Sequence, residues 1–243
     1  MNRNAIWLAL FCSTAAIAGP ADYVFMPNVE YGEREIDFKF GSAKQPGADD
    51  LRAASVGFGY GAREWWFTEL YLKYKREGSL GTRFDAIEWE NKFQLTETGK
   101  YPVDVGFITE FEAPRQSSEG YEFRFGPLLQ SEFGRLQLNA NLLFERVYRN
   151  SDGVAHSTEI GYQWQTKYRW RPEFEWGLQG FGEMGRWNKW DSADQQNHRL
   201  GPAIFGKIAL GNHQALRYNA AWLLGASSAA PGHTFRLQAE YEF

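Results

Sequence analysis

The sequence predicts an all-β fold in which about twelve antiparallel strands close into an up-and-down transmembrane β-barrel. First, apolar and polar residues alternate with period two through most of the chain after residue 18, which indicates strands with one apolar and one polar face. Second, tight turns and longer loops follow these segments alternately, as in an antiparallel meander. Third, no apolar run after residue 18 reaches the roughly 18 residues that a membrane-spanning helix needs.

Residues 1–18 have the three parts of a cleavable secretory signal peptide. Arg3 supplies the positive charge, an apolar stretch follows it, and Ala16-Ile17-Ala18 supplies a small-x-small cleavage pattern before Gly19. A transmembrane helix is the alternative interpretation of this stretch. At about 1.5 Å per residue, however, it reaches only about 21 Å, against a hydrocarbon core about 30 Å thick. We therefore expect cleavage after residue 18.

The remaining residues, 19–243, are expected to form a single barrel domain. Cys12 is the only cysteine and lies in the signal, so neither a disulfide nor a cysteine-bound metal is expected in the barrel. Lys and Arg number 26 against 30 Asp and Glu, and this absence of a basic excess disfavours nucleic acid as a partner. An aromatic content of 17% with a mean hydropathy of −0.52 is too polar for a helical membrane protein and suits a chain of strands.

The alternation defines the strands in order along the chain. It is clearest in the fourth strand, where Ile87 and Trp89 alternate with Glu88, Glu90 and Lys92, and in the last strand. Applied throughout, it places about twelve strands near residues 33–41, 52–61, 65–76, 84–95, 102–112, 120–130, 134–147, 158–170, 173–185, 198–209, 214–225 and 234–243. The longer connections, including residues 186–197, then all fall at one end of the barrel.

The apolar face is predicted to meet lipid and not a protein core. A soluble sandwich or lipocalin-like barrel would also alternate, but it would not need so many large aromatic residues near strand ends. Tryptophans on this face form the pattern of an aromatic girdle: Trp66, Trp89, Trp164, Trp170, Trp176 and Trp222. Because unpaired backbone groups are costly in lipid, such strands must close into a ring.

The final strand reads Phe235-x-Leu237-x-Ala239-x-Tyr241-x-Phe243 and ends on an aromatic residue. Together with the signal, the cysteine-free barrel and the alternation of turns and loops, it makes the chain resemble a Gram-negative outer-membrane β-barrel. The resemblance implies an outer-membrane location in contact with outer-membrane lipid, periplasmic termini and outward long loops. It also implies that Tyr241 and Phe243 belong to the signal read by the barrel assembly machinery. Channels, enzymes and adhesins share this architecture, so the resemblance indicates location more than function.

If the polar face lines the lumen, its charges fall into two groups. The fourth to sixth strands are mostly acidic and the last three are basic, so the two groups would face each other across a ring of twelve strands. Such walls orient dipolar solutes and disfavour apolar ones, which predicts a narrow channel for small polar or zwitterionic solutes. The candidate lumen residues are Glu88, Glu90, Lys92, Glu110, Glu122, Arg124, Lys167, Arg169, Lys207, Arg217 and Arg236.

Two alternatives remain open. Interior charges also pair to fill non-conducting barrels, which would leave a structural role or a role for the outward loops. An outer-membrane hydrolase would need a nucleophile and a base, and one loop holds Ser151, Asp152, His156 and Ser157. That loop is more simply explained by its Asn-Ser-Asp-Gly turn, so no catalytic residue is assigned. The four histidines lack the close spacing of a metal site, and no cofactor is expected.

Overall fold

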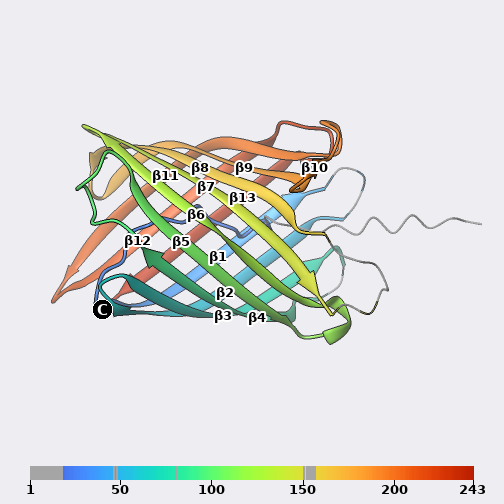
Figure 1. The fold of residues 1–243 in the computed structure, drawn as a ribbon, viewed down its shortest axis with the longest axis horizontal. Coiled ribbons are helices and arrows are strands. Elements are labelled where there is room, and N and C mark those ends of the chain that lie inside the picture. Colours follow the sequence, from blue (N-terminus) through green and yellow to red (C-terminus); the bar gives the residue numbers. More distant parts are fainter. Residues whose placement is uncertain (1–18, 46, 48, 80, 150, 152–156) are drawn as a thin grey trace, which may run out of the picture.

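The computed structural model describes residues 19–45, 47, 49–79, 81–149, 151 and 157–243. In these residues, a sheet of thirteen strands closes on itself, and twelve of them form the ring of an antiparallel barrel (Figure 1). The elements are β1 (Arg34–Lys44), β2 (Leu51–Arg63), β3 (Trp66–Glu77), β4 (Arg83–Gln94), β5 (Asp104–Pro114), η1 (Ser117–Glu119), β6 (Tyr121–Phe133), β7 (Leu136–Tyr148), β8 (Glu159–Arg171), β9 (Phe174–Arg186), β10 (Lys189–Trp190), β11 (Asn197–Gly211), β12 (Gln214–Gly225) and β13 (His233–Glu242).

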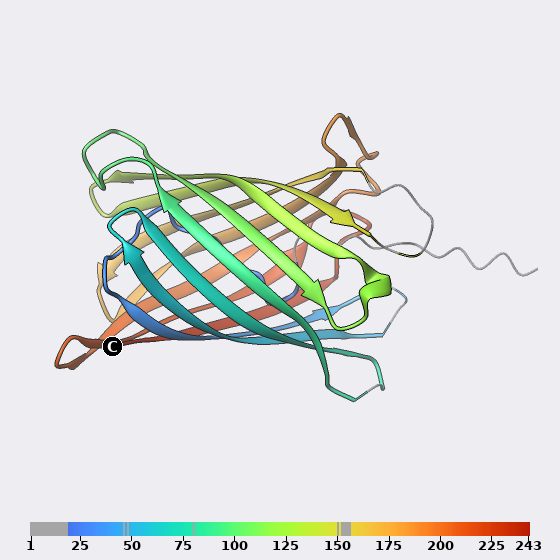
Figure 2. The same ribbon diagram turned by 60° about the horizontal axis from the view of Figure 1, so that its bottom comes forward.

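The ring closes through its first and last strands. β1 pairs with β13 in a register that places Ile36 opposite Tyr241, and β8 pairs with β9 to complete the circuit. Every strand pair is antiparallel, and the strands cross the barrel at a steep tilt (Figure 2). Closure leaves no long open edge in the ring, because each ring strand has a hydrogen-bonded neighbour on both sides.

The predicted strands correspond to the ring strands within a few residues at each end. One expectation needs correction, because residues 186–197 were expected to be a loop. β9 extends to Arg186, and the two-residue strand β10 folds back on it, pairing Trp190 with Gly185. This hairpin lies outside the ring, at the same end as the longer connections (Figure 1). Among the described residues, no helix is long and apolar enough to span a membrane.

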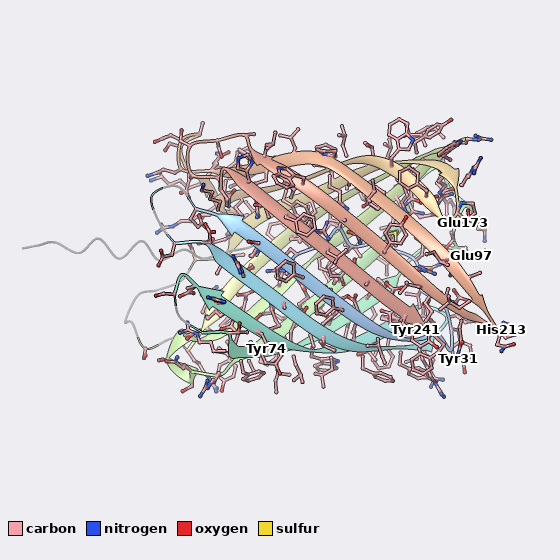
Figure 3. The ribbon with its side chains drawn as sticks, turned by 180° about the vertical axis from the view of Figure 1, so that it is seen from behind. Tyr31, Tyr74, Glu97, Glu173, His213 and Tyr241 are labelled. Carbon is pink, nitrogen blue, oxygen red and sulfur yellow. The ribbon has the colours of Figure 1, made fainter. Side chains whose placement is uncertain are left out.

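Alternate residues of each strand face outward and inward, as period two requires. In β13, Phe235 is 39% exposed while its neighbour Arg236 is 1% exposed. Large aromatic side chains cover the outer surface, and Figure 3 places Tyr74 toward the long-loop end and Tyr241 toward the short-turn end. The exterior is therefore apolar around the ring, with aromatic residues near both of its ends.

The interior is less uniformly polar than the sequence analysis expected. Inward positions of β5, β6 and β7 carry Ile108, Leu128 and Leu143, all nearly inaccessible to solvent. These side chains pack around Phe25, and a second cluster surrounds Val24. Both residues belong to the lumen segment, residues 19–33, which precedes β1 and lies inside the ring. The polar face of the strands lines the lumen, but a few of its positions are apolar because the lumen segment packs against them.

The lumen segment extends from the long-loop end of the barrel to the short-turn end. Inward glycines leave it room: a Cβ at Gly41 of β1 would collide with the carbonyl oxygen of Pro20, and one at Gly61 of β2 with that of Glu30. Near the short turns, the amide of Gly32 donates to the carbonyl of Gly61 at 2.8 Å. The segment therefore lies close against the wall near the long loops and is hydrogen-bonded to it near the short turns, where its last residues lead directly into β1.

Candidate functional site

The lumen holds the charged residues that the sequence analysis selected, and strand register arranges them in rows. Residues that face each other across neighbouring antiparallel strands lie at one height along the ladder. One such row crosses five strands from β3 to β7 and consists of Glu69, Glu90, Glu110, Arg124 and Glu145. All five side chains are at least nine-tenths buried. The row thus holds four carboxylates and a single guanidinium, and two of these carboxylates, Glu110 and Glu145, contact it directly.

Arg124 of β6 is the centre of the acidic side. Its Nη1 lies 3.2 Å from Glu110 Oε2, its Nη2 lies 3.4 Å from Glu122 Oε1, and its Nε lies 3.1 Å from Glu145 Oε2. Asp22 of the lumen segment adds a fourth carboxylate at 3.6 Å. Buried charges are tolerated when they are paired and hydrogen-bonded, and Arg124 meets this condition for Glu110, Glu122 and Glu145. Asp22 Oδ2 is paired with Arg124 by charge alone, because it has no hydrogen-bond partner among the described residues.

Two lysines near Arg124 add to the charge pairing on this side. Lys73 Nζ lies 2.7 Å from Glu88 Oε2 and 2.5 Å from Glu112 Oε2, so it bridges β4 and β5. Lys39 Nζ lies 3.6 Å from Asp37 Oδ2 and stacks over the ring of Tyr71 and that of Tyr23. The sequence analysis did not select Lys39 or Lys73, although both lie on the polar parity of their strands.

The opposite side of the ring has its own ion pairs. Lys207 Nζ of β11 lies 2.6 Å from Glu242 Oε2, and Arg217 of β12 also contacts Glu242. Glu33, at the end of the lumen segment, is 3.7 Å from Arg217. Burial raises the pKa of the Glu33 carboxyl above its usual value, and the charge of Arg217 opposes this shift. Arg236 of β13 donates to Gln179 Oε1 at 2.5 Å.

The remaining predicted lumen residues also lie on the inward parity of their strands. Lys167 pairs with Glu175 at 3.4 Å, Arg169 pairs with Glu132 at 2.6 Å, and Lys92 stacks over the ring of Phe67. Ring order places β4 to β6 across the lumen from β11 to β13, as expected. The ion pairs, however, join near neighbours on each side. Local pairing therefore weakens the field across the lumen that two unpaired walls would produce.

A network of amide side chains separates the two charged sides, and the sequence analysis did not identify it. Asn139 Oδ1 accepts hydrogen bonds from Gln137 Nε2 at 2.7 Å and from Gln165 Nε2 at 3.0 Å. Gln179 Nε2 donates to Gln165 Oε1 at 3.0 Å, and Gln179 in turn accepts from Arg236. In the sequence, these amide residues recur with period two on adjacent strands, so their inward position could have been predicted. The sequence analysis selected lumen residues by charge, and uncharged amides were therefore not selected.

The lumen segment is bonded to both the acidic side and the amide network. Tyr23 donates its hydroxyl to Glu90, with oxygen distances of 2.9 and 3.1 Å. Asn141 Nδ2 donates to the carbonyl oxygen of Phe25 at 3.0 Å, and the amide of Phe25 donates to Gln163 Oε1 at 3.4 Å. These hydrogen bonds satisfy backbone groups that would otherwise be buried without partners. They also hold the phenyl side chain of Phe25 near the middle of the lumen.

A cavity of about 500 Å³, lined in part by the first residues of the lumen segment, opens toward the long-loop end. Within the described residues, its lining carries nine carboxylates and four basic groups, an excess of five negative formal charges. Asp22, Lys39, Lys73 and Arg124 contribute to this lining. A solute that enters here meets charged groups of both signs, and the acidic excess attracts cations.

Two carboxylate triads have oxygen atoms within 4.8 Å of one another: Glu88, Glu90 and Glu110, and Glu33, Glu240 and Glu242. Oxygen ligands of this kind suit hard cations. The members of the first triad are already engaged by Lys73, Tyr23 and Arg124, and Arg217 contacts all three members of the second. Protein groups therefore provide the counter-charge at both triads.

The structure describes only part of the loop from Ser151 to Ser157, which holds the residues considered for a hydrolase. Asp152 and His156 lie outside the described residues. Ser151 donates its hydroxyl to the carbonyl oxygen of Ser118 at 3.4 Å, a contact typical of a loop. Of the other histidines, His198 accepts or donates a hydrogen bond of 2.9 Å with the Tyr162 hydroxyl, and His213 lies at a short turn at the opposite end of the barrel (Figure 3).

No protein-family model matches the chain, and no curated protein matches it in sequence. Solved structures share its fold. A NanC porin is 10% identical, with a TM-score of 0.56 over 86% of this chain and 98% of the porin. The COG4313 outer membrane channel from Pseudomonas putida F1 is 13% identical, with a TM-score of 0.60 over 93% of this chain and 98% of that channel. The translocator domain of the autotransporter NalP from Neisseria meningitidis is 13% identical and has a TM-score of 0.50, covering 88% of this chain and 89% of that domain. At these identities the likeness establishes the barrel fold.

Proposed function

We propose that this protein is an outer-membrane β-barrel that forms a narrow channel for small polar or zwitterionic solutes. The observation that carries the proposal is the division between the faces of the ring: an apolar, aromatic exterior and a charged interior with a cavity at the long-loop end. An apolar exterior of this kind is stable in lipid and unstable in water. The fold likeness to a porin and to an outer membrane channel supports the same conclusion.

The lining of the cavity favours solutes that carry an ammonium group. Carboxylates exceed basic groups there, so cations are attracted. Lys73 is the more accessible of the paired basic groups, and it can exchange one of its two glutamates for a carboxylate on the same solute molecule. A zwitterion can therefore exchange water for charged partners at both of its ends. An apolar solute has no such compensation and would have to displace bound water from charged groups.

Export and membrane insertion are part of the same proposal. Residues 1–18 direct the chain through the inner membrane, and cleavage after Ala18 releases the barrel. The strand that ends in Tyr241 and Phe243 is recognised by the barrel assembly machinery. In the folded protein the long-loop end faces the exterior and the short turns face the periplasm.

The channel is tested by reversal potentials in a salt gradient across planar lipid bilayers. The parent protein should conduct and prefer cations, because of the acidic excess. Glu88→Gln with Glu110→Gln should shift the preference toward anions, since two lumen carboxylates become neutral. Glu64→Gln with Glu97→Gln is the matched control, because it removes the same charge from exposed turns at the short-turn end. Equal reversal potentials for the two double variants would contradict a channel whose selectivity is set by these lumen carboxylates.

A non-conducting barrel is the second candidate, and the packed interior favours it. The lumen segment and the ion pairs of Arg124 fill much of the space that a solute would use. In that case the parent protein would show no conductance, and the two Glu→Gln changes would lower stability by leaving Lys73 and Arg124 with fewer partners. The bilayer experiment, combined with thermal unfolding of the same variants, separates the two functions.

A further inference from the structure

Two arginines at the long-loop end face outward and lie directly opposite each other on neighbouring strands. Arg52 of β2 and Arg76 of β3 are register partners, and both are exposed. Like charges that face each other in this way repel unless an anion lies between them. In the described part of the chain neither guanidinium forms an ion pair with a carboxylate. The contact of 3.4 Å from Arg76 Nε to the carbonyl oxygen of Gly78 leaves most donors of both groups available.

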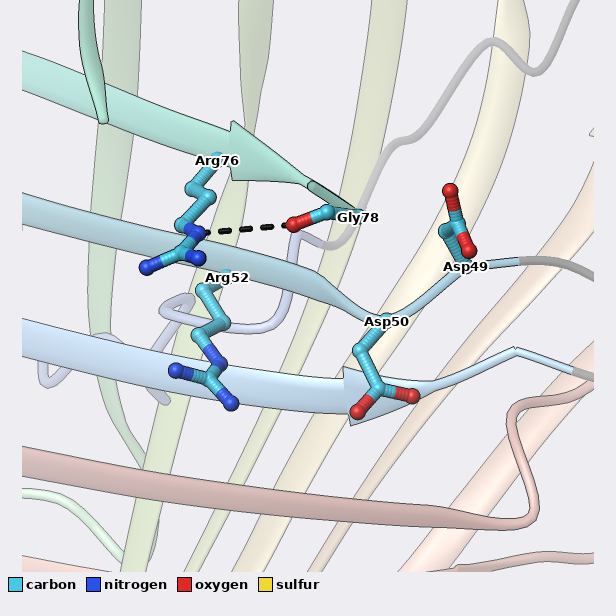
Figure 4. Close-up of a pocket in the computed structure, with 5 residues that line it drawn as sticks. All are labelled: Asp49, Asp50, Arg52, Arg76 and Gly78. Atoms are coloured by element: carbon cyan, nitrogen blue, oxygen red, sulfur yellow. Dashed lines mark hydrogen bonds between the residues drawn. The ribbon is translucent and has the colours of Figure 1, made fainter. Parts of the chain in front are cut away.

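The arginines line a cavity of about 340 Å³ together with Asp49, Asp50 and Gly78 (Figure 4). The amide of Gly78 donates to the carbonyl oxygen of Asp50 at 3.1 Å, which links the loop after β1 to the loop after β3. Both guanidinium groups extend back along their strands, whereas the two carboxylates lie on the loop side (Figure 4). The cavity is therefore cationic toward the barrel wall and anionic toward the loops.

The cationic side lies at the end of the apolar exterior. Outward residues that precede Arg76 on β3 include Leu72 and Tyr74, and those that follow Arg52 on β2 include Val56 and Phe58, all exposed. Val56 lies four positions after Arg52, which is about 13 Å along the strand. The guanidinium groups thus lie at the depth where a bilayer changes from acyl chains to headgroups, if the apolar exterior is in lipid.

We propose that Arg52 and Arg76 bind a phosphate group of an outer-leaflet lipid. A guanidinium offers parallel N–H donors that match phosphate oxygens. Directly opposed residues such as Arg52 and Arg76 have Cβ atoms about 5 Å apart, so their long side chains can converge on one phosphate. A lipid phosphate approaches from the membrane side, where the guanidinium groups lie. A free anion in water would first meet Asp49 and Asp50, which repel it, so the arrangement favours a lipid-borne phosphate. This inference depends on the proposed membrane location but not on solute passage.

The test measures binding of diphosphoryl lipid A to the detergent-purified full-length barrel by native mass spectrometry. The parent protein should retain a lipid A molecule, and Arg52→Gln with Arg76→Gln should lower the affinity about thirtyfold. The matched control is Arg34→Gln with Arg63→Gln, which removes two exposed arginines at the short-turn end and should leave the affinity unchanged. Arg76→Lys keeps the charge but loses the parallel donors, and it should fall between the parent and the double variant.

Three results would overturn the proposal. The first is equal loss of lipid A from the double variant and the control, which would indicate attraction by net charge alone. The second is equally tight binding of lipid A that lacks its phosphates. The third is release of lipid A by millimolar sodium phosphate, which would identify a site for the free anion. If the double variant does not fold, the single changes Arg52→Gln and Arg76→Gln decide the question by the same comparisons. Conductance is measured in a separate experiment. A negative result for lipid A binding therefore does not bear on the channel proposal.

Discussion

Replacing Phe25 with alanine should release the lumen segment and widen the channel. The ring is 3% exposed and packs against Ile108, Leu128 and Leu143 from three strands. Truncating a buried phenylalanine to alanine costs about 3–5 kcal/mol, since transfer and cavity terms add. The ring strands pair with one another and do not need the segment for their ladders. The cost should therefore appear mainly in docking of the segment, whose equilibrium would shift by about a hundredfold to a few thousandfold.

Two measurements report this release. Single-channel conductance should rise, because an apolar ring leaves the middle of the lumen. Labelling of a Val24→Cys probe by a bulky maleimide should also become faster, in a Cys12→Ser background that leaves the probe as the only thiol. Phe58→Ala is the matched control, because Phe58 faces outward and is 53% exposed. If Phe25→Ala instead lowers the unfolding temperature while conductance and labelling stay at parent values, the segment is an inseparable part of the folded core and the reasoning is refuted.

Three further predictions concern location, assembly and the acidic side. Fractionation should recover the protein in the outer membrane, shortened by about 18 residues, and recovery from the soluble periplasm would reject the membrane barrel. Deleting Phe243, or Phe243→Lys, should lower the folded yield, because this terminal ring stacks on Tyr241 at 5.6 Å between centroids and belongs to the assembly signal. The folded fraction is measured as the band whose mobility in a detergent gel changes when the sample is heated. An unchanged folded fraction in both variants would count against that role. Arg124→Gln should destabilise the barrel by about 3–5 kcal/mol in urea, since it leaves buried carboxylates unpaired. Arg169→Gln, which breaks a more exposed pair with Glu132, should cost less than about 1 kcal/mol. Equal costs for these two arginines would contradict the central position of Arg124.

The strands were predictable because the physics that selects them is local. Period two, with an aromatic residue at the outward position, identifies a strand without knowledge of its neighbours, as in β13. The inward positions of Glu90 and Arg236 follow from the same parity, and the structure places both inside the ring. Ring order followed as well, since consecutive antiparallel strands are adjacent.

Ion-pair partners and the lumen segment were not predictable in this way. Partners depend on register between strands, and a shift of one residue exchanges every facing pair. The pairing of Arg124 with Glu145 therefore needed the structure. Residues 19–33 contain the short apolar run Tyr-Val-Phe-Met-Pro, which has neither helical nor strand period. Its inward partners Ile108 and Leu128 looked like isolated exceptions on polar faces, because only the fold brings them around Phe25.

The position of the lumen segment also constrains the order of assembly. The segment is continuous with β1, and β1 pairs with β13, the last strand of the chain. The ring consequently closes only when its final strand is available, around a segment that was made first. Entry after closure would require rupture of the interior ion pairs and passage of Phe25 through a filled lumen. Pairing of β1 with β13 therefore encloses the segment together with the inward apolar residues that pack on it.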